Sequence, residues 1–340
     1  MVEISKHLFE STCRDVHCSV LLHPWSRSCW TSSFSTYGNS LVGSAKFYLI
    51  VHLAQNLMKG KKMLKRKELM KAGEYYVRST LLGALISGTC VSFGCLLRWI
   101  LGKQFTYYTY FLIPNTINGL FILLEPPKRR GLVINLFCNL AIEYWMRTLE
   151  INKVISLTKS KQTFLFMTGS ALLFYLMRLE GGRAKRTPLL WLFTPEKVRR
   201  KTDESKDVCP HTGPCSRHIL KAVICYLCRK QGYDSALYAL PAGYLAGLSF
   251  LFKPSLGFAI ASLTGAFKLY VTILYEKKVL PENVPLSLML YCICQGILFH
   301  SRFMHSDVCP QYIFKVMNSV TNGRTEILFN NLLEVIKSAT

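Results

Sequence analysis

Long apolar runs separated by short charged stretches dominate the pattern of this chain. The clearest run is 79–97, nineteen residues without a charge between Arg78 and Arg98. A helix rises about 1.5 Å per residue and the apolar core of a bilayer is about 30 Å thick, so about 20 such residues cross it. The pattern therefore predicts a membrane-spanning helix here, and further spans at 105–124, 131–149, 162–177, 235–252, 255–275 and 284–299.

Two weaker apolar stretches are interrupted by ionisable residues. The stretch 41–57 contains Lys46 and His52, and the ten-residue stretch 219–228 contains Lys221. We expect seven spans, and eight or nine if these two also cross. The predicted fold class is therefore all-α, a polytopic transmembrane helical bundle.

Composition and charge agree with a membrane protein and set the expected partners. Lys and Arg number 42 against 19 Asp and Glu, a net charge of +23, yet only 18% of residues are charged, against about 25% in soluble domains. A nucleic-acid-binding domain shares the charge but not the uncharged runs, so no nucleic acid partner is expected. The basic stretch 59–78 beside the clearest span predicts contact with anionic lipids, which attract Lys and Arg by about 1 kcal/mol each. The positive-inside rule places it on the cytosolic side.

The two halves of the chain repeat a pattern of prolines and glycines. Pro114 and Pro241 each precede a second proline, Pro127 or Pro254, by thirteen residues. Gly119-Leu120 and Gly247-Leu248 follow the first prolines at similar distances. We predict two related four-helix units, parallel if 219–228 crosses the membrane and inverted if it does not.

The pattern divides the chain into six predicted regions. The helical units are 79–177 and 216–300. The others are a Cys/His-rich N-terminal segment (1–40), a weak apolar segment with the basic cluster (41–78), a basic loop containing Cys and His (178–215) and a C-terminal tail (301–340). Small residues at helical spacing predict close helix packing, because small side chains let backbones approach in lipid; the candidates are Gly83, Gly243, Gly247, Gly257 and Gly265.

Three ionisable residues lie inside predicted spans. Glu143 and Arg147 are four residues apart on one helix face, an order that favours an ion pair. They either neutralise each other, or line a transport path together with Lys268, because intramembrane charges usually have partners or a function. Lys268 could instead extend its ammonium group to the membrane surface.

The sequence contains thirteen cysteines, and seven of them lie in two clusters that also contain histidines. One contains Cys13, Cys18 and Cys29 with His17 and His23. The other, in and after the basic loop, contains Cys209, His211, Cys215, Cys225 and Cys228. Such soft ligands could hold a tetrahedral zinc ion, and this second cluster is the candidate metal site. The alternative is reduced or acylated juxtamembrane cysteines.

The sequence predicts no enzyme. It lacks a G-x-S-x-G elbow, an H-E-x-x-H helix and a Walker A loop, which carry nucleophilic, zinc-hydrolytic and phosphate chemistry.

Several motifs together resemble the transmembrane protein 135 family. They are His23-Pro24 with Cys29, the stretch 98–103 (RWILGK), Glu143-x3-Arg147, Cys209-x-His211-x3-Cys215 and the stretch 242–247 (AGYLAG). The resemblance runs from about Cys13 to about Pro285. The chain departs from the family in a shorter central loop, 181–207, and in the tail after Phe299.

The resemblance implies a multi-pass protein of peroxisomal membranes that is also linked to mitochondria. It implies a role in fatty-acid handling and mitochondrial fission, a distant similarity to four-helix units of mitochondrial inner-membrane translocases, and no catalytic residues. Two mechanistic alternatives stay open. One is a transporter or channel for a small or anionic metabolite that uses Glu143, Arg147 and Lys268. The other is a scaffold that recruits membrane-protein partners through its Cys/His-rich loops.

Overall fold

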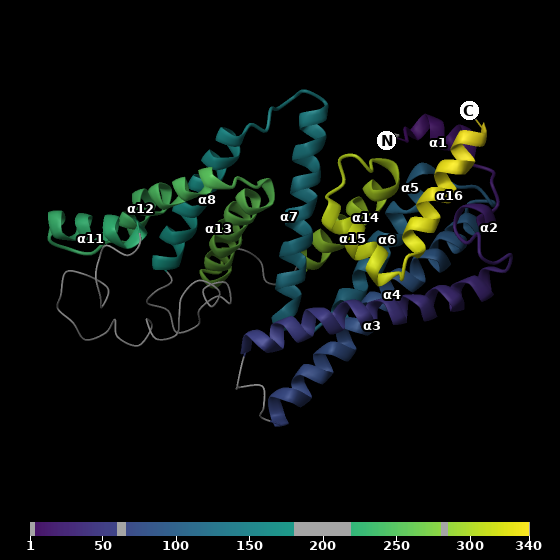
Figure 1. Cartoon of the computed structure of the whole chain (residues 1–340), viewed down its shortest axis with the longest axis horizontal. Coiled ribbons are helices and arrows are strands. Elements are labelled where there is room, and N and C mark those ends of the chain that lie inside the picture. The colour runs from purple at the N-terminus through teal and green to yellow at the C-terminus, as the bar shows by residue number, and fades with distance from the viewer. Residues whose placement is uncertain (1–3, 60–65, 180–218, 280–284, 340) are drawn as a thin grey trace. The chain divides into compact units, whose positions relative to one another are not determined.

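The computed structural model describes residues 4–59, 66–179, 219–279 and 285–339, and every regular element in them is helical, which confirms the all-α prediction (Figure 1). The first part of the chain forms α1 (Lys6–Cys13), α2 (Cys18–Leu21), α3 (Cys29–Lys59), α4 (Arg66–Ile100), α5 (Tyr107–Tyr110), α6 (Leu112–Asn118), the 3-10 helix η2 (Gly119–Leu124), α7 (Pro127–Ile151) and α8 (Lys159–Leu179). The second part forms α11 (Ile219–Gln231), η5 (Ala236–Tyr238), α12 (Ala239–Ala246), η6 (Gly247–Phe252), α13 (Leu256–Glu276), α14 (Leu286–Met304), α15 (Gln311–Val320) and α16 (Arg324–Ala339).

Three helices in the described part of the chain are long and apolar enough to cross a membrane: α4, α13 and α14. They contain, wholly or for the most part, the predicted spans 79–97, 255–275 and 284–299. Helices α3, α7 and α8 have the length for a crossing, but polar and charged residues lower their mean hydropathy below that of a typical span. Helix α11 is shorter, with 13 residues.

The predicted span 105–124 is not one continuous helix, and its crossing of the membrane stays a prediction. Phe111 departs from helical geometry (φ −133°, ψ −31°) and separates α5 from α6. Helix α6 then passes into η2 at Gly119. Pro114 is the third residue of α6. The N–H groups of the first turn have no partner within a helix, so a proline is tolerated there.

The paired glycines of the sequence occupy matching places in the helix order. A short α-helix becomes a 3-10 helix at Gly119 and again at Gly247, and a long helix follows each time. A Cβ at Gly119 would lie 2.7 Å from Cα of Cys292, and one at Gly247 would lie 2.8 Å from Cα of Met167. Both glycines therefore allow another helix backbone to approach closely. The repeat itself stays a prediction.

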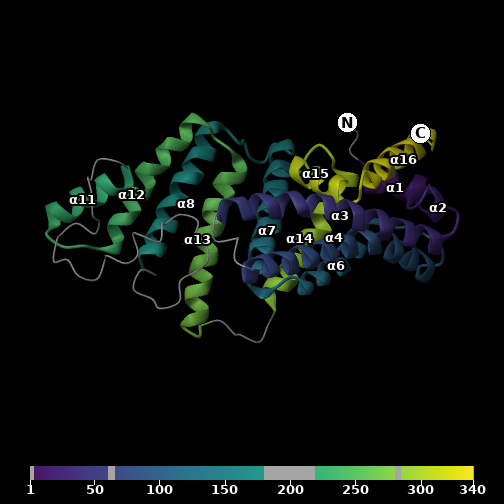
Figure 2. The same cartoon turned by 60° about the horizontal axis from the view of Figure 1, so that its bottom comes forward.

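The chain forms two compact units, one of residues 1–147 and 285–340 and the other of residues 148–284. In the first unit, α3 and α4 form a hairpin and lie side by side (Figures 1 and 2), and α14 packs on α6. In the second unit, α8 packs on α12 and α13. The compact units thus have other boundaries than the two helical units predicted from the sequence, 79–177 and 216–300.

Aromatic side chains fill the core of the first unit. Phe9 and Phe303 are almost completely buried, and the Phe111 and Phe303 rings stack with centroids 3.8 Å apart. The hydroxyl of buried Tyr110 donates to the carbonyl oxygen of Leu21 at 3.0 Å. Large buried rings supply much of the packing energy of a helical core, and here they hold α1, α2, α5 and α14 together.

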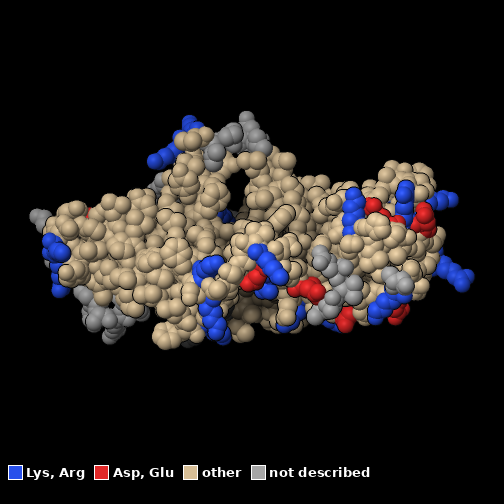
Figure 3. All heavy atoms as spheres, turned by 90° about the horizontal axis from the view of Figure 1, so that it is seen from above, with Lys and Arg blue, Asp and Glu red and all other residues tan. Residues whose placement is uncertain are grey.

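Uncharged side chains cover most of the face drawn in Figure 3. Large apolar side chains are exposed on the candidate spans, including Trp99 on α4, with 71% exposure, and Phe258 and Phe267 on α13. Extended exposed apolar surface marks an interaction site, and on helices of this length it indicates contact with membrane lipid.

Candidate functional sites: an apolar cavity and a buried Cys/His group

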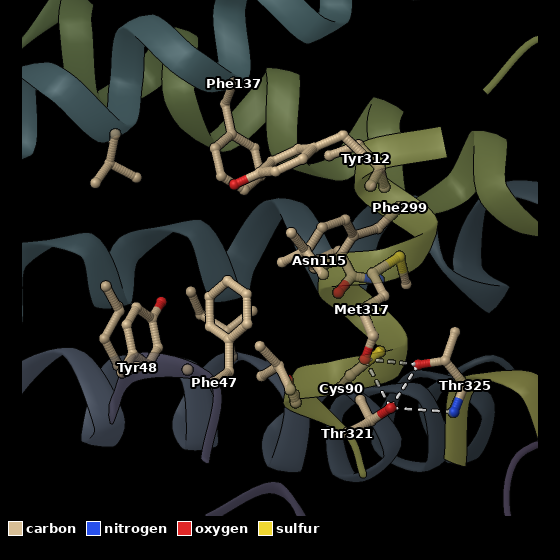
Figure 4. A pocket seen from close by; sticks show the side chains of 18 of the residues that line it. Phe47, Tyr48, Cys90, Asn115, Phe137, Phe299, Tyr312, Met317, Thr321 and Thr325 are labelled. Atoms are coloured by element: carbon tan, nitrogen blue, oxygen red, sulfur yellow. Dashed lines mark hydrogen bonds between the residues drawn. The ribbon is translucent and has the colours of Figure 1, made fainter. Parts of the chain in front are cut away.

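A cavity of about 230 Å³ lies within the first unit, between α3, α4, α7, α14, α15 and α16 (Figure 4). Its walls are mainly apolar and aromatic, and residues that point into it include Phe47, Tyr48, Phe137, Phe299 and Met317. Sites for small ligands are typically apolar hollows with a few placed polar groups. The cavity has this character.

Two glycines bring the helices of the cavity wall together. A Cβ at Gly83 of α4 would lie 2.7 Å from the Oγ of Ser44 and 2.9 Å from the ring of Tyr48 on α3. A Cβ at Gly43 of α3 would collide with the carbonyl oxygen of Val320 at the end of α15. Since Tyr48 and Val320 line the cavity, the two glycines set the position of its walls.

The ion pair of Glu125 and Arg129 forms one polar part of the cavity lining. The Glu125 side chain is 3% exposed and lies 3.6 Å from Nη1 of Arg129. Ser79 donates its hydroxyl to Oε1 of Glu125 at 2.9 Å. The other carboxylate oxygen, Oε2, is buried without a hydrogen-bond partner among the described residues. A buried unpaired acceptor is costly, so this oxygen is suited to a donor on a ligand.

A second polar group contains Arg324 and Trp25. The guanidinium of Arg324 lies 4.4 Å from the Trp25 ring centroid and donates to Oγ1 of Thr36 at 3.0 Å and Oγ of Ser35 at 2.8 Å. Burial lowers the pKa of Arg324. Nε1 of Trp25 is buried and has no partner within the described part of the chain. The hydrogen-bond partners of the Arg324 guanidinium named above are neutral hydroxyls, and the Nε1–H of Trp25 is an unpaired donor. A positive charge beside an unpaired donor suits an anion.

Two threonines at the junction of α15 and α16, Thr321 and Thr325, lie beside this second group. Thr321 donates to the carbonyl oxygen of Met317 at 2.7 Å, and its Oγ1 is 2.9 Å from that of Thr325 (Figure 4). The local bonds satisfy these hydroxyls and fix the junction between α15 and α16.

The cavity reaches the surface beside α7. Leu132 and Leu136 line it and are 62% and 39% exposed. A leucine that faces both a cavity and the outside marks an opening, and in a membrane protein such apolar surface faces lipid. An apolar molecule could therefore enter sideways from a bilayer.

The predicted transport residues lie away from this cavity. Arg147 donates to Oε1 of Glu143 through Nε at 3.0 Å and Nη2 at 2.7 Å, which is the self-neutralising pair. Their side chains are 44% and 13% exposed. Lys268 lies on α13, in the other compact unit, so its approach to Glu143 stays a prediction. None of the three residues lines the cavity.

The predicted zinc ligands fall largely outside the described residues. Cys209, His211 and Cys215 lie there. Cys225 and Cys228 are buried on α11, where the thiol of Cys228 lies 3.4 Å from Oδ1 of Asp234. A zinc ion at this cluster stays a prediction.

The remaining packing glycines lie on helices of the second unit. A Cβ at Gly243 would lie 2.9 Å from Cα of Ala171, so α12 and α8 approach closely there. On α13, Gly265 is buried and Gly257 is half-buried.

A different Cys/His group could hold a metal ion. The ligand atoms of Cys18, His23, Cys29 and Cys95 all lie within 4.8 Å of one another. The sequence pattern singled out the first three residues but not Cys95, which lies 66 positions after Cys29 in an apolar span. The spacing Cys-x4-His-x5-Cys was the signal for the first three. Glu125, Arg129 and Arg324 were also missed, and only the four-residue gap between Glu125 and Arg129 indicated a pair.

Residues 15–149 match the family model that describes the N-terminal cysteine-rich region of transmembrane protein 135. No solved structure matches the chain. The matched range contains the whole Cys18/His23/Cys29/Cys95 group and the cavity residues of α3, α4 and α7.

Proposed function

Because the chain belongs, through residues 15–149, to the transmembrane protein 135 family, we propose that this helical membrane protein acts in fatty-acid homeostasis by holding an acyl chain in its cavity. The observation that carries the proposal is the apolar cavity whose wall contains the buried donors of Arg324 and Trp25. The opening beside Leu132 supports lateral uptake from the membrane.

The size of the cavity favours a single chain. Its 230 Å³ lies just below the roughly 300–1,000 Å³ of typical small-molecule sites. Each buried methylene group contributes about 0.8 kcal/mol, so an acyl chain gains most of its affinity from the aromatic walls. The cost of immobilising the chain reduces that gain.

The chemistry of the second polar group favours a carboxylate. The guanidinium of Arg324 and the Nε1–H of Trp25 are hydrogen-bond donors. The guanidinium donates to the neutral hydroxyls of Thr36 and Ser35. Hydrogen bonds between charged partners are about twice as strong as neutral ones. A fatty acid therefore matches the apolar walls with its chain and the Arg324 group with its carboxylate.

Binding of a fluorescent long-chain fatty acid to the purified protein tests this proposal. Val133→Trp places an indole in the cavity lining, whereas Ile142→Trp adds the same group to α7 at a residue that is 39% exposed and does not line the cavity. We expect the first variant to weaken binding at least tenfold, about 1.4 kcal/mol, and the second to bind like the wild type. Equal affinity of both variants would contradict the proposal.

The cellular setting that we propose comes from the family. It is a peroxisomal membrane, and also a mitochondrial one, with a role in mitochondrial fission and without catalysis by the protein itself. Alkaline carbonate extraction together with organelle markers tests the location. Resistant protein on peroxisomes or mitochondria supports it, and resistant protein only at the plasma membrane contradicts it.

The transporter and scaffold alternatives have less support. The Glu143–Arg147 ion pair leaves little charge for a substrate path, and the cysteine-bearing loop of the scaffold hypothesis falls mainly outside the described residues. Both stay as predictions.

A further inference from the structure

Four potential metal ligands converge from separate parts of the first unit. Cys18 begins α2, Cys29 begins α3 and Cys95 lies near the end of α4, while His23 lies in the connection between α2 and α3. Their ligand atoms lie within 4.8 Å of one another. Cys18 and His23 are buried, and Cys29 and Cys95 are half-buried. Three thiols and an imidazole at this spacing match the Cys3His ligand set of structural zinc sites.

The histidine is oriented as a metal ligand. Nδ1 of His23 lies 2.7 Å from the carbonyl oxygen of Ser26. Because a carbonyl oxygen only accepts, Nδ1 carries the proton and Nε2 carries the lone pair. Nε2 is buried without a hydrogen-bond partner among the described residues, and the His23 side chain is 0% exposed. A backbone carbonyl that holds the second ring nitrogen is the usual support of a metal-bound histidine.

The sulfur separation also fits a zinc ion. Sγ of Cys18 and Sγ of Cys29 are 3.6 Å apart. Two sulfurs bound to one tetrahedral zinc at about 2.3 Å lie about 3.8 Å apart. The thiols therefore already have nearly the separation that the ion requires.

A buried cation compensates the charge of such a centre. Zinc with three thiolates and a neutral imidazole carries one negative charge. Arg98, one turn after Cys95, is 8% exposed and acts electrostatically on Cys18. Its Nε has no hydrogen-bond partner in the described part of the chain. The charge of Arg98 would thus be balanced by the metal centre, which lowers the cost of burying both.

We propose that Cys18, His23, Cys29 and Cys95 bind one structural Zn²⁺ ion. The four protein ligands complete a tetrahedron and leave no open position, and binding releases the three thiol protons. The ion would fasten the start of α3 and the segment 18–29 to the end of α4. This segment includes Trp25 of the cavity wall, so the metal would also hold that wall in place. The zinc proposal does not depend on the fatty-acid proposal.

Metal analysis of the full-length protein, purified in detergent without chelators, tests the site. We expect one zinc ion per chain, and loss of it in Cys18→Ser, Cys29→Ser and His23→Ala. Cys13→Ser and Cys90→Ser are matched controls, because both thiols are buried outside the group, and they should keep the zinc. His23→Cys should also keep it, since a fourth thiolate can replace the imidazole.

A second measurement needs no variant and therefore holds even if the variants misfold. X-ray absorption at the zinc edge of the wild type should show three sulfur ligands and one nitrogen ligand near the distances for zinc. A chain without stoichiometric zinc, a different metal, a zinc shell of other composition, or a Cys18–Cys29 disulfide found by mass spectrometry would each overturn the proposal.

Discussion

At the scale of single residues, two features indicate how the protein packs and what it binds. One is the close approach of backbones at glycines, and the other is buried polar atoms without hydrogen-bond partners. Gly43, Gly83 and Gly119 each lie where a Cβ would meet a neighbouring helix or the end of one. The atoms without partners, among them Oε2 of Glu125 and Nε1 of Trp25, point to ligand chemistry. The two kinds of residue predict different experimental effects, one on stability and one on binding.

Glycine substitutions on α3 separate packing from helix propensity. Gly43→Ala should destabilise the first unit by about 1–3 kcal/mol, because the added methyl group overpacks α3 against the end of α15. Gly38→Ala is the matched control, since nothing lies within 4 Å of its Cβ position, and it should stabilise the helix by up to about 1 kcal/mol. Thermal unfolding in detergent measures both changes. Equal shifts in the melting temperature would show that Gly43 makes no close contact.

Substitution of Arg324 tests the headgroup assignment. Arg324→Gln removes the charge but keeps donors near Thr36 and Ser35. We expect the affinity for a fatty acid to fall by roughly 10- to 150-fold, because a hydrogen bond to a charged group contributes about 1.5–3 kcal/mol. The affinity for the fatty alcohol of equal length should hardly change. Titration with the two ligands makes this comparison, and a parallel loss for both would place the carboxylate elsewhere.

At the scale of elements, sequence pattern predicted helices well and their continuity less well. The uncharged run 79–97 lies within the single helix α4, because length and hydropathy suffice to define such a span. The equally apolar run 105–124 is divided at Phe111 and Gly119, because backbone geometry and contact with α14 override hydropathy there. The sequence pattern gathered Cys18, His23 and Cys29 in one cluster but placed the candidate zinc site in the other cluster, around Cys209. Cys95 lies within an apolar run, and only the fold brings it to the first cluster.

The ion pair on α7 gives an element-scale prediction. Glu143→Gln should change stability by no more than about 0.5 kcal/mol, the usual contribution of such a helical pair. Arg147 is 44% exposed and can turn its charge to a polar region. We therefore expect the variant to fold like the wild type. In reconstituted vesicles, the flux of a small anionic metabolite should be the same for the variant and the wild type. A folded variant with abolished flux would restore the transporter alternative.

At the scale of the whole molecule, the Cys18/His23/Cys29/Cys95 group and the cavity belong to the same compact unit. Both are built from residues before 147 or after 285, and the family match over 15–149 covers much of this unit. The second unit has its own small core of Leu173, Leu176, Ala266, Leu269 and Ile273. Binding of a metal ion or a lipid to the first unit should therefore change the local stability of that unit and leave the stability of the second unit unchanged.

Removal of zinc should affect the first unit alone. Treatment with a strong chelator should speed amide hydrogen exchange at least tenfold, about 1.4 kcal/mol, in α2, the start of α3 and the end of α4. Exchange in α8, α12 and α13 should stay as before. Exchange followed by mass spectrometry resolves these segments, and equal acceleration in both units would argue against separate stability.

Photochemical labelling with a diazirine-bearing fatty acid, followed by peptide mapping, tests the central claim most directly. The probe should label residues that line the cavity, such as Val133 on α7, Cys90 on α4 and Met317 on α15, and excess unlabelled fatty acid should prevent it. The Val133→Trp variant should lose this labelling and Ile142→Trp should keep it. Labelling spread over the exposed faces of α4 and α13, without competition, would show contact with bulk lipid only and would contradict a fatty-acid site in the cavity.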